Sequence, residues 1–414
     1  MNSPFSYQNG ALHAEAVPLE TVAARFGTPC YVYSKAALVS AYGQISNAFA
    51  GRDHLICYAV KANPNIGMLN LFANMGSGFD IVSSGELQRV LMAGGDASKV
   101  VFSGVGKRAD EMQTALEADI LCFNIESEPE LDRLSRVAQS MKRTARISLR
   151  VNPDVDAKTH PYISTGLKQN KFGIPHDEAL RLYEKAKTLP GIEIAGIDCH
   201  IGSQLTELAP IVEALEKMLA LVDALAKRGI VLSHIDMGGG VGIRYKDEQP
   251  PAMTDYANAL IEKLEGRSQQ LILEPGRFLV GNAGILLTRI EYLKHGQDRN
   301  FAIVDCAMND LMRPALYDAY HDIVPVLAGH DGEVYEVVGP VCETGDFLGH
   351  ARTLPAREGD LLAILSAGAY GMSMSSNYNS RPRVPEILVD GHDCHVLRER
   401  ETLASLTQFE RIIP

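Results

Sequence analysis

The sequence lacks several features that define other classes of protein. No stretch approaches the 18 or so consecutive apolar residues that a membrane-spanning helix needs. Residues 1–10 contain neither a basic residue nor an apolar core, so they do not resemble a secretory signal. Positive charge is also in deficit, with 39 lysines and arginines against 51 aspartates and glutamates and a net charge of −12. This balance disfavours nucleic acid and anionic membranes as general partners, although it allows a local cationic pocket for a small anion.

Paired cysteines are missing as well. The seven cysteines are scattered, odd in number and never arranged as Cys-x-x-Cys. A disulfide framework is therefore not expected, and a reducing cytoplasm is the predicted location. Hydrophobic residues make up 46% of the chain and charged residues 22%, which is the composition of a globular protein. At about 150 residues per domain the length predicts two or three domains, although a (β/α)8 barrel takes about 250 residues as one domain.

Short β-type segments alternate with helical segments over residues 35–284. The expected strands are Leu55–Val60, Phe79–Ser83, Val100–Ser103, Ile120–Ile125, Ala145–Val151, Ile194–His200, His234–Met237 and Gln270–Glu274. A helical period is found in Ser84–Ala93, Ala109–Ala118, Glu128–Met141, His176–Leu189, Pro210–Arg228 and Thr254–Gly266. This α/β pattern predicts a closed (β/α)8 barrel, with a doubly wound sheet as the alternative because strand order alone does not show closure.

The pattern changes after residue 284. Several β-type runs separated by Gly, Pro and Asp turns replace the long helical periods: Leu286–Leu293, Phe301–Val304, Tyr335–Val338, Leu361–Ile364 and Glu386–Val389. Residues 285–414 are therefore predicted to form a second, mostly antiparallel β domain. The β-type run Cys30–Tyr33 precedes the first barrel strand and is expected to pair with this domain, so residues 1–34 would complete it.

Four groups of residues with chemical potential follow the predicted barrel strands. Lys61 comes directly after the first strand and His200 at the end of the sixth. Gly238–Gly242 follow the seventh strand, and Glu274–Arg277 close the eighth. Each group has a structural explanation of its own, such as a satisfied histidine, a tight turn or a surface ion pair. Because active sites of barrel enzymes are built where the strands end, the four groups together predict an active site at that face.

The chemistry of these residues points to pyridoxal 5'-phosphate. A lysine amine that its surroundings keep partly neutral can form a Schiff base, and glycine amides can approach a phosphate closely. The glycine run is not a dinucleotide fingerprint, because Ile243-Arg244-Tyr245 follow it and the third glycine of G-x-G-x-x-G is missing. No G-x-x-x-x-G-K-[ST] motif occurs in the sequence, so nucleotide hydrolysis loses its main support.

With these motifs the sequence resembles the diaminopimelate decarboxylase family, which belongs to the pyridoxal-phosphate enzymes with an alanine-racemase-like barrel. The resemblance covers nearly the whole chain, from Gly27-Thr28-Pro29 to Arg398–Thr402. Its specific blocks are Tyr58–Asn65, Phe79–Leu87, His200–Gln204, Gly238–Gly242, Glu274–Arg277, Gly339–Asp346 and Gly368–Gly371.

The resemblance implies a set of cofactor-binding residues. Lys61 is expected to hold the cofactor covalently and to act later as a base, and His200 to lie against one face of the pyridine ring. Glu274 is expected in a solvated cleft, facing the pyridine nitrogen and keeping it protonated, so that the ring accepts the electron pair left by departing carbon dioxide. The other expected cofactor contacts are Ser203, Gly240, Gly276, Arg277 and Tyr370.

The resemblance also implies how a substrate is recognised. The far carboxylate is expected to be bound by Arg277, Arg313 and Tyr317, and Tyr370 to contact the substrate as well as the cofactor phosphate. An arginine suits a carboxylate because its planar fork binds both oxygens. Glu343 is expected to pair with the far ammonium, and Cys342 to donate a proton to carbon after decarboxylation. In the family the loop with these two residues reaches the neighbouring subunit's site, which implies a homodimer with shared active sites.

The predicted reaction is decarboxylation of meso-2,6-diaminopimelate to L-lysine and carbon dioxide, the last step of lysine biosynthesis. Glu274 favours decarboxylation, because the related racemases place an arginine there. One alternative is a decarboxylase of another basic amino acid, such as ornithine, arginine or D-lysine. These substrates lack a far carboxylate and would leave Arg313 without a counter-charge, which is costly. The other is a cofactor-holding protein without activity, against which the long C-terminal part argues.

A metal site is not expected. The cluster His392-Asp393-Cys394-His395 contains ligand-type residues, but their spacing is incomplete for zinc. It follows Asp390-Gly391 and is better explained as the turn of a β-hairpin.

Overall fold

The computed structural model describes residues 4–155, 171–329 and 331–414, which form two compact units. The barrel unit contains Tyr42–Ile243 and Gln249–Phe278. The β unit contains the chain up to Ala41, the segment Arg244–Glu248, and Leu279–Pro414.

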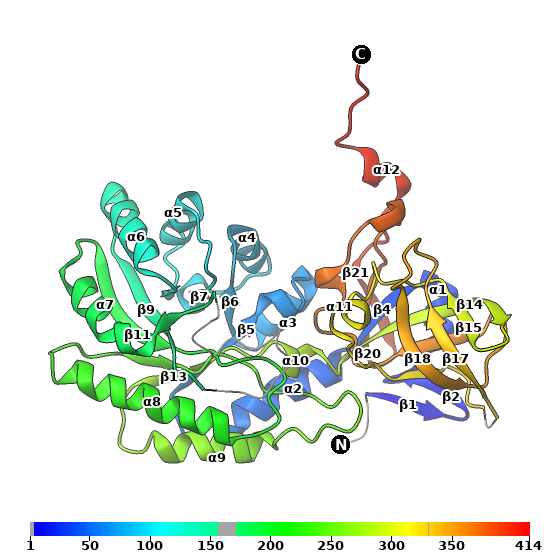
Figure 1. The fold of residues 1–414 in the computed structure, drawn as a ribbon, viewed down its shortest axis with the longest axis horizontal. Helices are drawn as coiled ribbons and strands as arrows, with labels where there is room; N and C mark the ends of the chain where they lie inside the picture. Colours follow the sequence, from blue (N-terminus) through cyan, green and yellow to red (C-terminus); the bar gives the residue numbers. More distant parts are fainter. Residues whose placement is uncertain (1–3, 156–170, 330) are drawn as a thin grey trace. The chain divides into compact units, whose positions relative to one another are not determined.

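Eight parallel strands form a closed barrel in the first of these units (Figure 1). In ring order they are β5 (His54–Ala59), β6 (Gly78–Ile81), β7 (Val100–Phe102), β8 (Cys122–Ile125), β9 (Ala145–Asn152), β11 (Ile192–Asp198), β12 (His234–Asp236) and β13 (Gln270–Leu273). Pairing of β13 with β5 and of β8 with β9 completes the ring. The predicted barrel is therefore confirmed, and the doubly wound alternative is excluded by this closure. A two-residue strand, β10 (Ile174–Pro175), lies beside β9.

The helices of this unit cover the outside of the strands (Figure 1). They are α3 (Ile66–Asn74), α4 (Ser84–Met92), α5 (Ala109–Glu117), α6 (Glu128–Met141), α7 (His176–Thr188), α8 (Ala209–Ala226) and α9 (Met253–Lys263); α2 (Lys35–Ala48) enters from the β unit. Two short 3-10 helices, η1 (Val60–Ala62) and η2 (Ala97–Lys99), complete the set. Serine side chains begin α4 and α6 by accepting hydrogen bonds from N–H groups of the first turn, at Ser83 and Ser127. Some barrel strands are apolar throughout, as in the fully buried Val100–Phe102, whereas others, such as Gly78–Ile81, also bury a polar side chain.

The β unit contains a nine-stranded sheet. Its strands are β4 (Cys30–Ser34), β14 (Gly284–His295), β15 (Asn300–Val304), β16 (Ile323–Pro325), β17 (Glu333–Val338), β18 (Phe347–Leu354), β19 (Leu361–Ile364), β20 (Glu386–Asp390) and β21 (Asp393–Arg398). Most pairs are antiparallel, as predicted, while β15–β17 and β4–β20 are parallel. The expected pairing of Cys30–Tyr33 with the C-terminal strands is present, since β4 lies between β14 and β20.

Smaller elements complete the β unit. A three-stranded sheet is made by β1 (Phe5–Gln8), β2 (Ala11–Ala14) and β3 (Val17–Pro18), and α1 (Leu19–Phe26) follows it. The remaining elements are the short helices α11 (Arg313–Tyr317), α12 (Leu403–Thr407), η3 (Met372–Met374) and η4 (Tyr378–Ser380). Helix α10 (Arg277–Val280) begins in the barrel unit and ends in the β unit. A core of apolar side chains joins the small sheet and α1 to strands β4 and β14. The 392–395 cluster lies at a hairpin between β20 and β21, as predicted.

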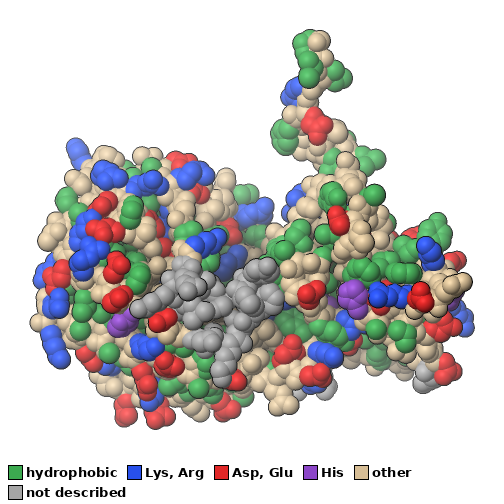
Figure 2. Space-filling model, viewed as in Figure 1, with side chains coloured by type: hydrophobic (Ala, Val, Ile, Leu, Met, Phe, Trp, Pro, Cys, Tyr) green, Lys and Arg blue, Asp and Glu red, His purple; other side chains and the backbone are tan. Residues whose placement is uncertain are grey.

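Many charged side chains lie on the face of the barrel unit that Figure 2 shows. Figure 2 shows lysine and arginine interspersed with aspartate and glutamate over its helices. In the described ranges of the chain, no helix is both long and apolar enough to cross a membrane.

Candidate active site

Lys61 lies where β5 ends, on the short helix η1. Its Nζ makes an ion pair with Oδ2 of Asp80, a fully buried residue of the neighbouring strand β6. The two side chains meet because β5 and β6 are paired with Ala59 opposite Asp80. The lysine side chain is 39% exposed, so its amine is anchored at the barrel end and still reachable from outside.

Three further carboxylates gather beside this pair. Asp198, Asp236 and Glu274 stand at the ends of β11, β12 and β13, and one oxygen of each lies within 4.8 Å of the others. They converge because these strands are adjacent and parallel, with Asp198 opposite Asp236 in the register. Asn124 of β8 donates a hydrogen bond from Nδ2 to Oε1 of Glu274 over 3.4 Å.

The expectation that Glu274 lies in a solvated cleft is wrong. Its exposed fraction is 6%, and Asp198 and Asp236 are 1% and 0% exposed. Strand β13 places Glu274 at the end of the barrel beside Asp198 and Asp236, and all three side chains are buried there. Carboxylate trios of this kind are chemically able to hold a divalent cation. Here, however, the positive charge of Lys61 already stabilises the ionised form of Glu274, and that of Arg150 the ionised form of Asp198.

Burial makes these carboxyl groups reluctant to ionise. It raises the pKa of Asp236 to about 7, and the negative charge of Asp80 adds to the effect. Burial likewise raises the pKa of Asp198 and of Glu274 well above the usual range, and their acidic neighbours contribute. Lys61 opposes the shift at Glu274, and Arg150, whose Nε lies 4.0 Å from Oδ2 of Asp198, opposes it there. A cationic group placed against Glu274 would therefore be strongly favoured.

The charge cluster predicts an unusual pH dependence for the protein without cofactor. A carboxyl whose pKa is raised by folding destabilises the folded state at high pH. The cost is small below the pKa of the unfolded state, near 4, and complete above the pKa of the folded state. Asp236→Asn removes this penalty and keeps the Oδ1 that accepts the Gly238 N–H over 2.8 Å. We expect it to raise Tm at pH 8 and to change it little at pH 4.5, measured by calorimetry.

A matched control comes from the surface of the barrel. Asp223 is exposed and its pKa is lowered by a hydrogen bond from Arg267, so Asp223→Asn should lower Tm slightly at pH 8. If Asp236→Asn instead lowers Tm at both pH values, the ionised carboxylate stabilises the fold and the sign of the argument is wrong.

His200 follows β11 and is held by the glycine turn. The N–H of Gly239 donates to Nδ1 of His200 over 3.2 Å, so Nδ1 carries a lone pair and not a proton. Loss of solvent around the half-buried ring lowers the pKa of His200 well below its usual value, and the charges of Arg150 and Lys61 add to this. The result is a neutral imidazole, which suits stacking against another aromatic ring.

The turn Gly238–Gly240 requires glycine for close approach. A Cβ on Gly238 would lie 2.7 Å from Nδ1 of His200, and one on Gly239 would lie 2.1 Å from the carbonyl oxygen of Glu274. Gly240 has a φ of 109° and would place a Cβ 2.3 Å from the carbonyl oxygen of Gly202. The backbone can therefore pack tightly between three strand ends, which is the geometry of an anion-binding cradle.

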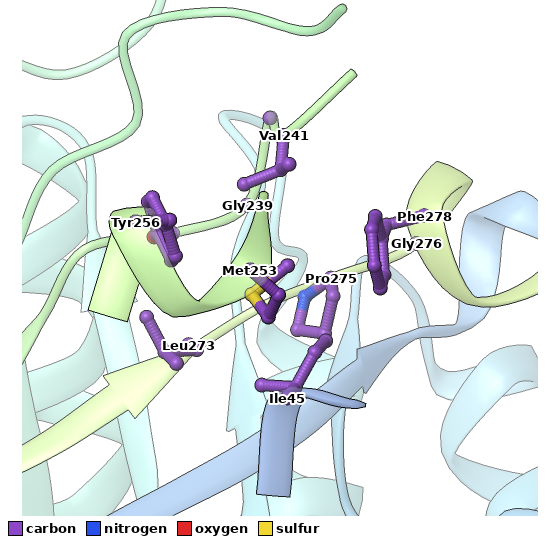
Figure 3. A pocket seen from close by; sticks show the side chains of 11 residues that line it. Ile45, Gly239, Val241, Met253, Tyr256, Leu273, Pro275, Gly276 and Phe278 are labelled. Carbon is purple, nitrogen blue, oxygen red and sulfur yellow. The ribbon is translucent and has the colours of Figure 1, made fainter. Parts of the chain in front are cut away.

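Apolar side chains support this turn from one side. They line a pocket made of Ile45, Gly238–Val241, Met253, Tyr256, Leu273, Pro275, Gly276 and Phe278. Figure 3 shows Met253 of α9, Pro275 of the turn after β13 and Ile45 of α2 pointing into it from different elements. The glycine turn therefore borders a pocket with an apolar lining.

Two more of the predicted residues meet in the barrel unit. Nη2 of Arg277, at the start of α10, donates to Oγ of Ser203 over 3.0 Å. Arg277 is 6% exposed, and Gly276 precedes it directly. The structure therefore brings Ser203, which follows β11, together with the residues that follow β13.

The other predicted residues belong to the β unit. Arg313 begins α11 and is 7% exposed, while Tyr317 ends the same helix and is half-buried. Cys342 and Glu343 are both exposed, on a turn where the N–H of Cys342 donates to Oδ1 of Asn379 over 2.8 Å. An exposed thiol on an ordered turn differs from the small buried thiols common in protein cores.

Asp346 and Tyr370 show strong local constraint. The carboxylate of Asp346 accepts hydrogen bonds from the N–H groups of Met308 and Val341 over 2.7 and 2.9 Å, which fixes the turn that carries Cys342. Tyr370 has a φ of 56°, a conformation that non-glycine residues adopt at a cost. Such strain is typical of functional positions.

Several residues of the barrel site were not predicted. These are Asp80, Asn124, Arg150, Asp198 and Asp236. Asp198 and Asp236 occupy the last positions of their strands, just before the motifs that were singled out at His200 and Gly238. Their position could have marked them as site residues, because a charged residue at the end of a buried, mainly apolar strand is unusual.

The barrel residues fit pyridoxal phosphate. An amine, a buried carboxylate, a neutral imidazole and a cradle too tight for any Cβ stand at one end of the barrel. The cofactor offers an aldehyde, a basic ring nitrogen, an aromatic ring and a phosphate, which match these groups one for one.

Comparison with known proteins agrees with this chemistry. Residues 35–281 match the family described as pyridoxal-dependent decarboxylase, pyridoxal binding domain. The chain is 58% identical over 411 residues to a protein of Pseudomonas aeruginosa named diaminopimelate decarboxylase, covering 99% of each. Among solved structures it resembles diaminopimelate decarboxylase from Helicobacter pylori complexed with L-lysine, with 44% identity, a TM-score of 0.92 and coverage of 95% and 99%. It also resembles the M. jannaschii enzyme in co-complex with L-lysine, with 37% identity, a TM-score of 0.94 and coverage of 99% and 98%. The chain belongs to the diaminopimelate decarboxylase family of pyridoxal-dependent enzymes.

Proposed function

We propose that this protein decarboxylates meso-2,6-diaminopimelate to L-lysine and carbon dioxide with pyridoxal 5'-phosphate. The observation that carries the proposal is the meeting of Lys61, Glu274 and the glycine cradle at one end of the barrel. Relatives named diaminopimelate decarboxylase along the full chain, and similar structures solved with L-lysine, support the choice of substrate.

The barrel residues would bind and tune the cofactor. When bound, it supplies an electron sink for the pair of electrons that carbon dioxide leaves behind. Lys61 would hold the cofactor aldehyde through Nζ, and Asp80 holds this amine at the barrel end. Glu274 would keep a proton on the ring nitrogen, and the neutral imidazole of His200 would face the cofactor ring. The amides of Gly240 and Gly276 bind the phosphate. Ser203, Arg277 and Tyr370 make further contacts with the cofactor.

The β-unit residues would select the substrate and return a proton. Arg313 and Tyr317, with Arg277, bind the far carboxylate, and Glu343 pairs with the far ammonium. Cys342 donates a proton to the carbon that has lost carbon dioxide. Its exposure on an ordered turn supports a role toward a site outside its own turn.

We also propose the setting in which the protein works. Residues 35–284 form the cofactor-binding domain, and residues 285–414 with 1–34 form the β domain. A homodimer is the catalytic unit, in which the turn with Cys342 and Glu343 serves the partner's site. The reaction is the last step of lysine biosynthesis, in the cytoplasm, which the odd number and scattered spacing of the cysteines support.

The decisive experiment measures carbon dioxide release by the purified protein. Meso-diaminopimelate should be turned over, whereas ornithine, arginine and D-lysine should react at least about 100-fold more slowly in kcat/KM, because the site's far-carboxylate contacts would be unmade. A preference for any of the other three substrates would overturn the substrate assignment.

Covalent binding of the cofactor gives a prediction about Lys61. The purified protein should be yellow, and borohydride should bleach this absorbance and fix the cofactor to Lys61, identified by peptide mass spectrometry. Lys61→Ala should bind cofactor without covalent fixation. Fixation at a different lysine in the wild type would refute the assignment. Lys107, which is buried and paired with Glu130, serves as the control and should carry no cofactor after reduction.

A further inference from the structure

The side chain of Arg313 is enclosed by two aromatic residues of the β unit. Its Nη1 lies 2.9 Å from Nε2 of His321, and its guanidinium carbon lies 4.7 Å from the ring centre of Tyr245. The two rings meet edge to face, with centres 5.3 Å apart and an angle of 81° between the planes. His321 is fully buried and Tyr245 is 9% exposed, so the guanidinium is held in a nearly dry environment.

The hydrogen bonds of His321 fix its protonation state. Its Nδ1 lies 2.9 Å from the carbonyl oxygen of Leu365, which can only accept, so Nδ1 carries the hydrogen. In the neutral ring Nε2 then carries a lone pair and accepts from Nη1 of Arg313. A protonated imidazole would instead turn an N–H toward the guanidinium, which would oppose two positive charges.

His321 is itself anchored on both sides. Nη2 of Arg352 donates to the carbonyl oxygen of His321 over 2.8 Å, and the N–H of Leu365 donates to the carbonyl oxygen of Asp322 over 2.8 Å. The Arg352 guanidinium also lies 3.9 Å from the ring centre of Tyr320. The acceptor presented to Arg313 therefore has a fixed position relative to β18 and the end of β19.

Tyr245 restrains the guanidinium in a second direction. It lies in the segment Arg244–Glu248, which packs with the β unit although it follows β12 of the barrel in sequence. Glu248 shapes this segment, because its carboxylate accepts hydrogen bonds from the N–H groups of Tyr245 and Lys246 over 2.9 and 2.7 Å. The ring provides a cation–π contact, while the hydrogen bond to His321 acts at the Nη1 edge of the guanidinium.

We propose that His321 and Tyr245 are positioning residues that hold the Arg313 guanidinium in the orientation in which it binds the far carboxylate of the substrate. The proposal rests on the proposed function, in which Arg313 makes that contact. A two-point contact between guanidinium and carboxylate requires both planes to coincide. An arginine side chain has many rotamers, so fixing it before the substrate arrives strengthens binding without touching the reacting atoms.

A matched pair of variants at His321 tests the hydrogen bond. His321→Gln keeps an acceptor near the position of Nε2 but loses the donor to Leu365, whereas His321→Asn keeps a donor near Nδ1 and loses the acceptor for Arg313. We expect His321→Asn to raise KM for meso-diaminopimelate about 10-fold or more with kcat changed less than about threefold, and His321→Gln to stay within about threefold in both. The reverse order would show that the contact to Leu365 matters and would overturn the proposal.

Variants at Tyr245 test the stacking contact. Tyr245→Phe keeps the ring and should retain a KM close to wild type, whereas Tyr245→Leu should raise KM several-fold at similar kcat. Tm and cofactor absorbance of all four variants separate a loss of folding from a loss of positioning.

Inhibition constants provide a second measurement, which reports binding of the far carboxylate separately from catalysis. L-lysine retains the far carboxylate, and 1,5-diaminopentane has none. The inhibition constant of L-lysine should rise in His321→Asn and Tyr245→Leu, while that of 1,5-diaminopentane should not. Unchanged constants in both variants would overturn the positioning role and leave the proposed function intact. A wild type that ignores meso-diaminopimelate and is not inhibited by L-lysine would overturn both.

Discussion

Glu274→Gln is expected to lower kcat by about 100- to 1000-fold while cofactor content stays near that of wild type. A neutral amide cannot hold the proton on the ring nitrogen, so the electron pair left by carbon dioxide would be poorly stabilised. KM should change little, because Glu274 acts on the cofactor and not on the substrate's far end. Single-turnover and steady-state rates on meso-diaminopimelate, with absorbance spectra of the loaded protein, measure both quantities.

The structure adds a stability control to this experiment. Burial raises the pKa of Glu274, its acidic neighbours add to the effect, and Asn124 donates a hydrogen bond to its Oε1. Glutamine keeps an oxygen that can accept this bond and removes one charge from the cluster, so the cofactor-free variant should be at least as stable as wild type at pH 8. Near-native turnover would show that another group holds the ring proton. A large drop in Tm would mean that the ionised carboxylate stabilises the barrel.

The barrel was predictable from sequence because its strands and helices carry strong local patterns. Continuous apolar runs such as Val100–Phe102 mark strands covered on both faces, and the amphipathic period of Glu128–Met141 marks an outer helix. All eight strands fall within two residues of their predicted positions. Closure of the ring was predicted from the number of strands, but the doubly wound alternative is excluded only by the pairing of β8 with β9 and of β13 with β5.

The acidic cluster could not be predicted from motifs that are considered one at a time along the chain. Asp80, Asp198, Asp236 and Glu274 are far apart in sequence, and each has an ordinary explanation when taken alone. They meet only because parallel strands end at one level, and the resulting burial was not visible in the motif around Glu274. The solvated cleft was expected from the chemistry of a cofactor site, whereas Glu274 is buried beside the glycine turn, where Gly239 approaches its carbonyl oxygen closely.

The surroundings of Arg313 were hidden for a similar reason. His321 is eight positions away in sequence, but its partner Leu365 and the ring of Tyr245 come from distant segments. In a single sequence, a histidine and a tyrosine outside any motif do not indicate that they contact Arg313. The β unit was predictable as a class, because turn residues separate its strands, while its nine-strand order required long-range pairing.

Arg313→Ala should distinguish the proposed substrate from its rivals. Loss of a charge-assisted contact in a closed site costs on the order of 2 to 4 kcal/mol, or about 30- to 1000-fold in kcat/KM for meso-diaminopimelate. The residual activity on ornithine or D-lysine, which lack the far carboxylate, should change much less.

Arg313→Lys provides the matched control, because it keeps the charge and removes the planar fork. It should recover only part of the activity, since an ammonium binds a carboxylate as a point charge and cannot use the hydrogen bond to His321 in the same geometry. The hydrogen bond and the ring contact together explain why the guanidinium is needed: two protein groups already match its shape before the substrate binds. Equal losses on every substrate in Arg313→Ala would mean that Arg313 supports the fold of α11 and not the recognition of the far carboxylate. In that case the decarboxylase chemistry of the barrel would stand, and the choice of diaminopimelate would have to rest on residues other than Arg313.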